Sequence, residues 1–485
     1  MIILNIMHIK YNPMYEKRDI LGITLIAASI LIFIYMFLSP LTNMIINVDE
    51  YWTYTLVNLP FVNGMIVAVH DVHPPLYYLI LYLFTPFGLD NLYLLKAISI
   101  IPYGLLILVS LTKIREEYGW FTAGLFIFTL GVMTDFFIQF LTIRMYSWGL
   151  FFVLMSFIYY KDVITYWDRK SWVLLTLFTL LSAYTQYFFA ITCGLIYLLL
   201  LVKILREHKD KLKQYGKSIL ALIILYAPWS VVLLHQIKGK SGEGHESLVL
   251  SNLIHYATYF GIKSEDFSFE MIIFKIVAIV FLIFILVLIY RQKDKFAATG
   301  VFLMYGTIAV GLISLMFSFE NIMRVRYLVP VFGIFWLSAS IVIGKIKDNR
   351  IFAVALILVF VLAGASLYIT NEDINDRMAF NEERAAFLES INNNSTVIVY
   401  NTDYGYRILH TELNNTKQYT LSDTYYFSDD VEICKDFDKI LNKTKGKNVY
   451  LVNWNHADKN AKYEQNYDLE KQYDAGHYTF NLVKR

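Results

Sequence analysis

Charged residues are scarce in this sequence. They make up 17% of the 485 residues, against about 25% in an ordinary soluble domain, and hydrophobic residues make up 57%, against about 45–50%. This composition excludes a soluble cytosolic enzyme and a disordered chain. The formal net charge of +2 provides no polycationic face for phosphates, so we expect no nucleic-acid partner. The excess of apolar residues predicts a protein that lies in a bilayer.

Several common site motifs are also missing. The two cysteines, Cys193 in an apolar run and Cys434 in a polar one, are not expected to meet, which excludes a disulfide framework. No set of cysteines and histidines has the spacing of a zinc site. Gly239, Gly242 and Gly244 lack the spacing of a phosphate-binding loop, and no strand precedes them.

The charges that are present concentrate at the C-terminal end. Residues 371–485 hold 33 of the 82 charged side chains, so this segment is about 29% charged and the first 370 residues are about 13% charged. The first value is typical of a globular domain and the second of a membrane protein. We therefore predict a transmembrane domain over residues 1–370 and a soluble α/β domain over residues 371–485.

Apolar runs of spanning length recur through the first 370 residues. They cover residues 20–41, 92–112, 120–140, 145–160, 218–234, 271–290, 300–317, 328–343 and 351–369. The run 172–201 is too long for one helix, and we expect a tight hairpin that turns at Thr185–Tyr187. The run 75–87 is short and contains Pro86, so we expect a juxtamembrane or re-entrant segment. Nine single runs and the two helices of the hairpin together predict about eleven membrane spans.

Basic residues in the short loops indicate the orientation. With eleven spans, all basic loops fall on the side of the N-terminus, which we therefore expect to be cytoplasmic in the cell membrane. These loops hold Lys10, Lys17 and Arg18; Lys113 and Arg115; Lys161, Arg169 and Lys170; Lys203 to Lys217; Arg291, Lys293 and Lys295; and Lys345, Lys347 and Arg350. The C-terminal domain is then extracytoplasmic. Four Asn-X-Ser/Thr acceptors lie in that domain, although its many asparagines could produce them by chance.

Polar residues gather where the chain should reach the outer leaflet. Asp49 and Glu50 follow the first span, where an acidic pair is costly if it enters hydrocarbon and is usually functional. Alternatively, the pair caps a juxtamembrane helix. Further on come His70, Asp71 and His73, followed by two prolines and then by Tyr77 and Tyr78. The His70–His73 spacing with Asp71 could also hold a cation.

Two arginine-containing segments fall on the same side. Arg144 and Tyr146 begin one span, and Arg324, Arg326 and Tyr327 precede another. An arginine at such a boundary can extend its head group to the interface, but its planar fork also suits a phosphate. Because arginines on the outer side oppose the usual charge bias, we expect an anion there, such as the phosphate of a lipid carrier.

The order and spacing of these residues resemble the polytopic glycosyltransferases of the GT-C class. The similar branch contains the protein O-mannosyltransferases and the lipid A aminoarabinose transferase. The resemblance covers about residues 20–343 and rests on the following motifs: the acidic pair, the string from Asp71 to Tyr78, Arg144-Met145-Tyr146, and Arg326-Tyr327-Leu328 with Pro330. It implies a mainly α, GT-C-like helical bundle. The turn at Tyr184–Tyr187 also fits, with Gln186 where a histidine is expected.

The resemblance further implies a polyprenyl-phosphate sugar as donor, used on the extracytoplasmic side, with a protein, lipid or glycan acceptor and membrane lipid as partners. Asp49 is then the residue that acts at the acceptor hydroxyl, with Glu50 beside it. Relatives carry a second acidic residue before the Arg-Met-Tyr turn, where this chain has Thr142 and Ile143. The second acid is absent or is supplied by Asp135, so a divalent metal stays open, and no other cofactor is expected.

The residues also allow this chemistry on their own. Glycosyl transfer has an oxocarbenium-like transition state, and a carboxylate such as Asp49 can take the proton of the attacking hydroxyl. Arginines would stabilise the charge that grows on the leaving phosphate, and a single base with in-line attack predicts inversion. The alternative is a transporter or flippase of a lipid-linked or anionic substrate, for which paired ionisable residues at the midplane and inverted repeats would be expected. An inactive scaffold is a further alternative.

The C-terminal segment has the pattern of a small α/β domain. Residues 397–400, 448–454 and 478–482 resemble strands, and residues 384–391 and 431–441 resemble helices. It contains no recognisable catalytic constellation. Acceptor recognition and a structural cap are equally compatible with it.

Overall fold

The computed structural model describes residues 13–38, 48–71, 73–84, 92–239, 268–316, 325–401, 409, 412–421, 431–454, 466–474 and 478–484. The chain forms two compact units, one of residues 1–42 with 65–372 and the other of residues 43–64 with 373–485. The predicted division after residue 370 stays a prediction. Helix α16 runs through that position without a break, and the sequence did not predict that residues 43–64 group with the C-terminal segment.

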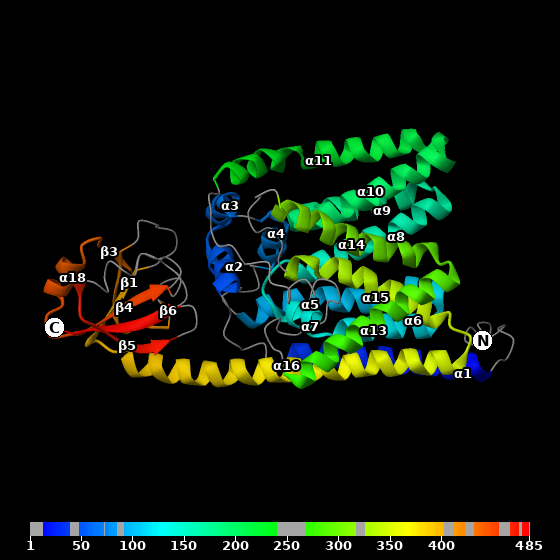
Figure 1. The fold of residues 1–485 in the computed structure, drawn as a ribbon. Helices are drawn as coiled ribbons and strands as arrows, with labels where there is room; N and C mark the ends of the chain where they lie inside the picture. Colours follow the sequence, from blue (N-terminus) through cyan, green and yellow to red (C-terminus); the bar gives the residue numbers. More distant parts are fainter. Residues whose placement is uncertain are drawn as a thin grey trace, which may run out of the picture. The chain divides into compact units, whose positions relative to one another are not determined.

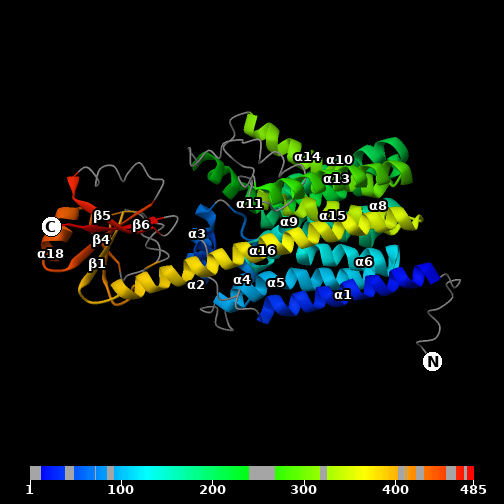
Figure 2. The same ribbon diagram turned by 60° about the horizontal axis from the view of Figure 1, so that its bottom comes forward.

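The first unit is a bundle of helices that lie side by side (Figures 1 and 2). Its helices are α1 (Pro13–Leu38), α3 (Phe61–His70, whose first residues belong to the second unit), α4 (Leu76–Tyr82), α5 (Leu92–Val109), α6 (Arg115–Val132), α7 (Thr134–Leu141), α8 (Tyr146–Tyr166), α9 (Arg169–Thr185), α10 (Tyr187–Glu207), α11 (Leu212–Gly239), α13 (Phe269–Gln292), α14 (Lys295–Met316), α15 (Val329–Gly344) and α16 (Asn349–Ile391, whose residues from Asp373 on belong to the second unit). This confirms the predicted helical membrane fold.

Nine helices in the described part of the chain are long and apolar enough to cross a membrane. One of the nine, Leu92–Val132, contains Gly119, whose φ of 86° and ψ of 170° break the helix in two. Positive φ is costly for residues with a Cβ, so glycine suits this sharp reversal. Helix α9 has 17 residues, only slightly fewer than the 19 of the shortest of the nine. With these two adjustments, the helices correspond to the eleven expected runs.

The predicted hairpin within residues 172–201 is confirmed. Helix α9 ends at Thr185 and α10 begins at Tyr187, and Gln186 between them is extended. The Gln186 side chain caps α10, since its Oε1 accepts hydrogen bonds from the backbone N–H groups of Phe188 and Phe189. Helix α4 has only seven residues, which is too short for a crossing.

Helix α15 is the centre of the bundle. Every residue from Val329 to Ile343 is buried, and α15 packs on α6, α8, α13 and α14. By contrast, α13 leaves many apolar side chains exposed, such as Ile276 and Ile283, as a helix in contact with lipid would. Helices α1 and α6 approach most closely at Gly22 and Gly124, where a Cβ on Gly124 would lie 2.2 Å from the Gly22 carbonyl oxygen. Small residues allow such backbone contact between membrane helices.

The basic loops predicted to be cytoplasmic meet at one end of this bundle. Lys113, in the π-helical segment Ser110–Ile114 that joins α5 to α6, pairs with Asp162 near the end of α8. Lys345, after α15, contacts Asp294 between α13 and α14 at 2.5 Å. Arg18 of α1 donates to the backbone oxygen of Ile346 at 2.5 Å. The loops therefore lie together as the predicted topology requires, while the side of the membrane stays a prediction.

The second unit contains α2 (Val48–Asn58) and a six-stranded sheet with the strand order β3-β2-β1-β4-β6-β5. The strands are β1 (Thr396–Tyr400), β2 (Lys417–Thr420), β3 (Glu432–Ile433), β4 (Asn448–Trp454), β5 (Leu469–Asp474) and β6 (Tyr478–Val483). Strands β1 to β4 are parallel to their neighbours in this set, and β6 runs antiparallel to β4 and β5. Val399 and Leu451 pack with Phe437 and Ile440 of α18 (Phe437–Lys443) in its core.

One predicted helix of this unit is wrong in its first half. Residues 431–441 were expected to be helical, but Glu432 and Ile433 form β3 beside β2. The helix α18 begins only after Asp436, whose side chain accepts a hydrogen bond from the Lys439 N–H at 3.0 Å. An aspartate at this position favours a helix start, and the preceding residues are free to extend the sheet.

Candidate active site

The segment after α3 is held by a buried carboxylate. Asp71 Oδ2 accepts a hydrogen bond from the hydroxyl of Tyr78 in α4 at 2.6 Å and lies 3.2 Å from His73 Nδ1. The Tyr78 side chain is fully buried, and His73 is only 6% exposed. The two prolines between His73 and α4 prevent a continuous helix, so the chain folds back and brings Tyr78 to Asp71.

Arg144 extends this chain of contacts from a second element. It lies in the turn between α7 and α8, is 3% exposed, and places Nη2 3.2 Å from His73 Nδ1 and 3.3 Å from His73 Nε2. Arginine can only donate, and Asp71 can only accept when ionised. The His73 ring thus lies between the Asp71 carboxylate, which contacts Nδ1, and the Arg144 guanidinium, which contacts both ring nitrogens.

These contacts set the charge of Asp71. Burial alone would raise the pKa of Asp71, but His73, Arg144 and the hydrogen bond from Tyr78 outweigh it and hold the pKa well below its ordinary value of 3.8. Burial and the Asp71 carboxylate raise the pKa of Tyr78, so its hydroxyl keeps its proton. The stabilisation from Asp71 is present above its ordinary pKa and is lost only as the pH falls below that value.

A third element contributes Arg326 and Tyr327. They lie in a short 3₁₀ helix, Val325–Leu328, just before α15. The Arg326 guanidinium carbon is 5.7 Å from the ring centre of Tyr146, the first residue of α8, and the rings of Tyr146 and Tyr327 are 6.0 Å apart. The ring centres of Phe188, which comes just after the Gln186 turn, and Tyr327 are 6.2 Å apart. Three of the predicted segments, around His73, Arg144 and Arg326, therefore lie next to one another within the first unit, whereas Asp49 and Glu50 belong to the second unit.

Other predicted residues lie apart from this cluster or beyond what the structure describes. Tyr77 is fully buried, and its hydroxyl is 2.8 Å from Ser99 of α5, so its predicted place in a lipid groove stays a prediction. His70 is at the exposed end of α3, with its ring 6.0 Å from that of His235. Arg324 and most of the loop from His235 to Glu270 lie outside the described residues.

Asp49 and Glu50 lie in the first turn of α2, in the second unit. Asp49 is half-buried and Glu50 is 5% exposed. Carboxylates in a first turn interact favourably with the helix dipole. The position of the pair therefore agrees with the alternative that it caps the start of a helix. That position does not conflict with a catalytic role, which stays a prediction. Asp135 has a comparable position in the first turn of α7.

The cation interpretation of His70, Asp71 and His73 is wrong for the described residues, which contain no group of three or more acidic, cysteine or histidine side chains placed to hold a metal ion. The physical reason is Arg144. Its Nη2 lies 3.2 Å from His73 Nδ1 and 3.3 Å from His73 Nε2, so a divalent ion bound by this ring would meet a positive charge. These residues therefore do not fit a divalent metal.

The residues that support α3 were not predicted from the sequence. The Gln236 amide of α11 donates to the backbone oxygen of Val69 at 3.0 Å, and Tyr187 donates to Gln236 Oε1 at 2.5 Å. Trp229 Nε1 donates in turn to the Tyr187 hydroxyl at 3.0 Å. Gln236 is a polar residue at the end of an apolar run, and that was the signal that could have found it.

The fold is similar to that of known structures. Over 95% of this chain and 97% of the other, it matches the crystal structure of ArnT from Cupriavidus metallidurans in the apo state, with a TM-score of 0.58 and 11% sequence identity. It also matches ArnT from Cupriavidus metallidurans bound to undecaprenyl phosphate, with a TM-score of 0.53, 12% identity and the same coverage. No family model and no curated protein matches the sequence. The likeness confirms the GT-C fold that the sequence motifs implied.

Proposed function

We propose that the chain is an integral membrane glycosyltransferase that moves a sugar from a polyprenyl-phosphate-linked donor to an acceptor on the extracytoplasmic side. The observation that carries this proposal is the pair of arginines around Tyr146. Arg144 is buried and oriented by His73, and Arg326 lies beside the Tyr146 ring. Two guanidinium groups at one end of an apolar bundle suit the phosphate of a lipid. The similar ArnT structure, which was solved with undecaprenyl phosphate, supports the same ligand class.

In the proposed reaction, the acceptor oxygen attacks the anomeric carbon while the bond between that carbon and the phosphate oxygen breaks. The proton of the acceptor goes to the Asp49 carboxylate, with Glu50 beside it, and the phosphate leaves with the electron pair. Arg144 and Arg326 stabilise the charge that grows on the phosphate. Attack opposite the leaving group inverts the anomeric configuration, and no acid is needed because a phosphate is a good leaving group.

The remaining predicted residues are proposed to shape the donor site. Asp71 and Tyr78 hold His73, and His73 holds Arg144, so these three act by positioning an arginine. His70, Tyr77, Tyr146, Arg324 and Tyr327 complete the proposed donor-binding set.

The test is transfer of labelled sugar from polyprenyl-phosphate donors in membranes that contain the full chain. Asp49→Asn should lower the rate about 10²–10⁴-fold, the usual contribution of a general base. Asp210→Asn is the matched control, because the Asp210 side chain is 66% exposed and lies between α10 and α11, with the basic loops. A rate near wild type in Asp49→Asn would remove the base assignment. Absence of transfer and of sugar release from every donor in the wild type would overturn the function.

A further inference from the structure

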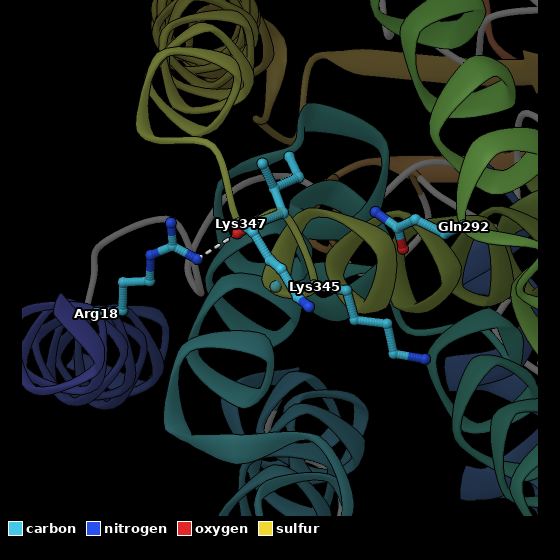
Figure 3. A pocket seen from close by; sticks show the side chains of 6 residues that line it. Arg18, Gln292, Lys345 and Lys347 are labelled. Carbon is cyan, nitrogen blue, oxygen red and sulfur yellow. Dashed lines mark hydrogen bonds between the residues drawn. The ribbon is translucent and has the colours of Figure 1, made fainter. Parts of the chain in front are cut away.

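A second cationic site lies among the basic loops, in the first unit. There the structure has an open cavity of about 590 Å³. It is lined by Arg18, Gln292, Gly344, Lys345, Ile346 and Lys347. Figure 3 shows that Arg18 comes from α1, Gln292 from the end of α13, and the two lysines from the connection between α15 and α16. Three helices and the connection between α15 and α16 therefore build this cavity, and none of its residues belongs to the proposed active site.

Two of the lining cations are held in place. Arg18 is 7% exposed, donates to Ile346 O at 2.5 Å and to Asn349 Oδ1 at 3.3 Å, and lies over the Phe352 ring at 3.9 Å. Lys345 contacts the Asp294 carboxylate at 2.5 Å. The guanidinium and the ammonium are thus fixed before any ligand arrives, which lowers the entropic cost of binding one.

Two further polar groups line the cavity. Lys347 is exposed and forms no ion pair with any residue that the structure describes. Gln292 uses its amide N–H to bind Val342 O at 2.8 Å, and its Oε1 is buried and accepts no hydrogen bond within the described part of the chain. A buried acceptor without a donor is costly, so this oxygen favours a ligand that carries a hydroxyl. The cavity thus offers positive charge together with one hydrogen-bond acceptor.

The surface next to the cavity is apolar and exposed. Within the first two turns after Arg18, Ile20 and Ile23 of α1 are 57% and 47% exposed. Tyr290 of α13 is 84% exposed beside Gln292, and Val354 of α16 is also exposed. Such surfaces face acyl chains in a bilayer, so the cavity lies where lipid head groups meet the protein.

We infer that this cavity is a binding site for an anionic glycerophospholipid whose head group carries a hydroxyl, such as phosphatidylglycerol. The phosphate lies between Lys347 and Lys345, with the Arg18 guanidinium beside it, the head-group hydroxyl donates to Gln292 Oε1, and the acyl chains lie along the exposed apolar residues of α1 and α13. Basic pockets between membrane helices on the cytoplasmic side are suited to such head groups. The combination of phosphate, hydroxyl and acyl chains distinguishes this ligand from a soluble anion.

The experiment titrates the purified full chain in neutral detergent with dioctanoyl phosphatidylglycerol and follows the bound lipid by native mass spectrometry. Dioctanoyl phosphatidylcholine supplies a head group without a hydroxyl or net charge, and inorganic phosphate supplies the anion without chains. We expect phosphatidylglycerol to bind at least tenfold more tightly than either. Equal binding of the two lipids, or displacement of phosphatidylglycerol by inorganic phosphate at similar concentration, would overturn the inference.

Variants identify the site without an activity measurement. Lys347→Gln should weaken phosphatidylglycerol binding about fivefold, since one basic residue near a membrane surface contributes about 1 kcal/mol. Lys345→Gln should weaken it more, because it also removes the ammonium that pairs with the Asp294 carboxylate next to the cavity, and Asp294→Asn in the same chain should restore part of the loss. Arg350→Gln removes a nearby exposed charge that does not line the cavity and should leave binding unchanged. Equal effects of Lys347→Gln and Arg350→Gln would contradict the assignment.

Discussion

At the scale of single residues, the candidate site depends on a relay of contacts from Tyr78 through Asp71 and His73 to Arg144. Each member is buried or nearly so, and each has a partner of complementary hydrogen-bonding type. A guanidinium held in this way keeps its position when the ligand is absent. The relay therefore explains how an arginine can be kept ready for a phosphate in an apolar surrounding.

The adjacent tyrosines of α4 provide a matched test of the relay. Tyr78→Phe removes a hydrogen bond to a charged carboxylate and should cost about 1.5–3 kcal/mol, whereas Tyr77→Phe removes a bond to the Ser99 hydroxyl and should cost about 0.5–1.5 kcal/mol. Both side chains are fully buried, so the two changes remove the same atom from similar surroundings. The measurements are thermal unfolding in detergent, where Tyr78→Phe should lose more stability than Tyr77→Phe, and the KM for donor, which Tyr78→Phe should raise above the wild-type value. A wild-type KM in Tyr78→Phe would argue against a positioning role.

At the scale of elements, the bundle uses glycine in two different ways. At Gly119 the positive φ allows the chain to reverse after α5, and at Gly22 and Gly124 the missing Cβ allows two helices to touch through their backbones. Other glycines, such as Gly194 in α10, have open space around the missing Cβ. Helix contacts of the second kind fix the position of α1, which carries Arg18.

This difference gives a second prediction. Gly124→Ala should destabilise the protein, because its Cβ would lie 2.2 Å from a backbone oxygen that cannot move aside. We expect a loss of about 1–3 kcal/mol. Gly194→Ala is the control and should raise stability by about 0.5–1 kcal/mol, since alanine favours a helix and nothing opposes its Cβ. The measurement is the thermal unfolding of both variants in the same detergent. A Gly124→Ala protein as stable as the wild type would show that α1 and α6 do not pack as described.

At the scale of the whole molecule, the sequence predicted what depends on local composition. Spans were found because a helix needs about 20 apolar residues to cross a bilayer, and the hairpin at Gln186 followed from a run too long for one helix. The relay could not be predicted, because Arg144 and His73 are 71 positions apart and only folding brings them together. The short strand β3 and the cavity at Gln292 likewise depend on partners from other elements.

The orientation of the chain is a prediction at this scale. Lys347 and Lys447 are both exposed, the first among the basic loops and the second in the C-terminal unit. In a cysteine-free background, an impermeant maleimide added to intact cells should label Lys447→Cys and should label Lys347→Cys only after the membrane is opened. We expect this labelling pattern because short loops rich in lysine and arginine lie on the cytoplasmic side of a membrane. The reverse labelling pattern would place the N-terminus outside.

The most direct measurement for the account as a whole is the rate of sugar transfer from a polyprenyl-phosphate donor by Arg144→Gln. Because Arg144 is proposed to stabilise the leaving phosphate, kcat/KM should fall about 10²–10³-fold. Arg115→Gln is the control, since Arg115 is two residues from Lys113, and Lys113 pairs with Asp162 near the other end of α8. Asp162 lies about 25 Å along the helix axis from the start of α8, next to which Arg144 is found. We predict that Arg115→Gln stays near wild type. Equal rates in Arg144→Gln and the wild type would contradict the proposal that this cluster binds the donor phosphate.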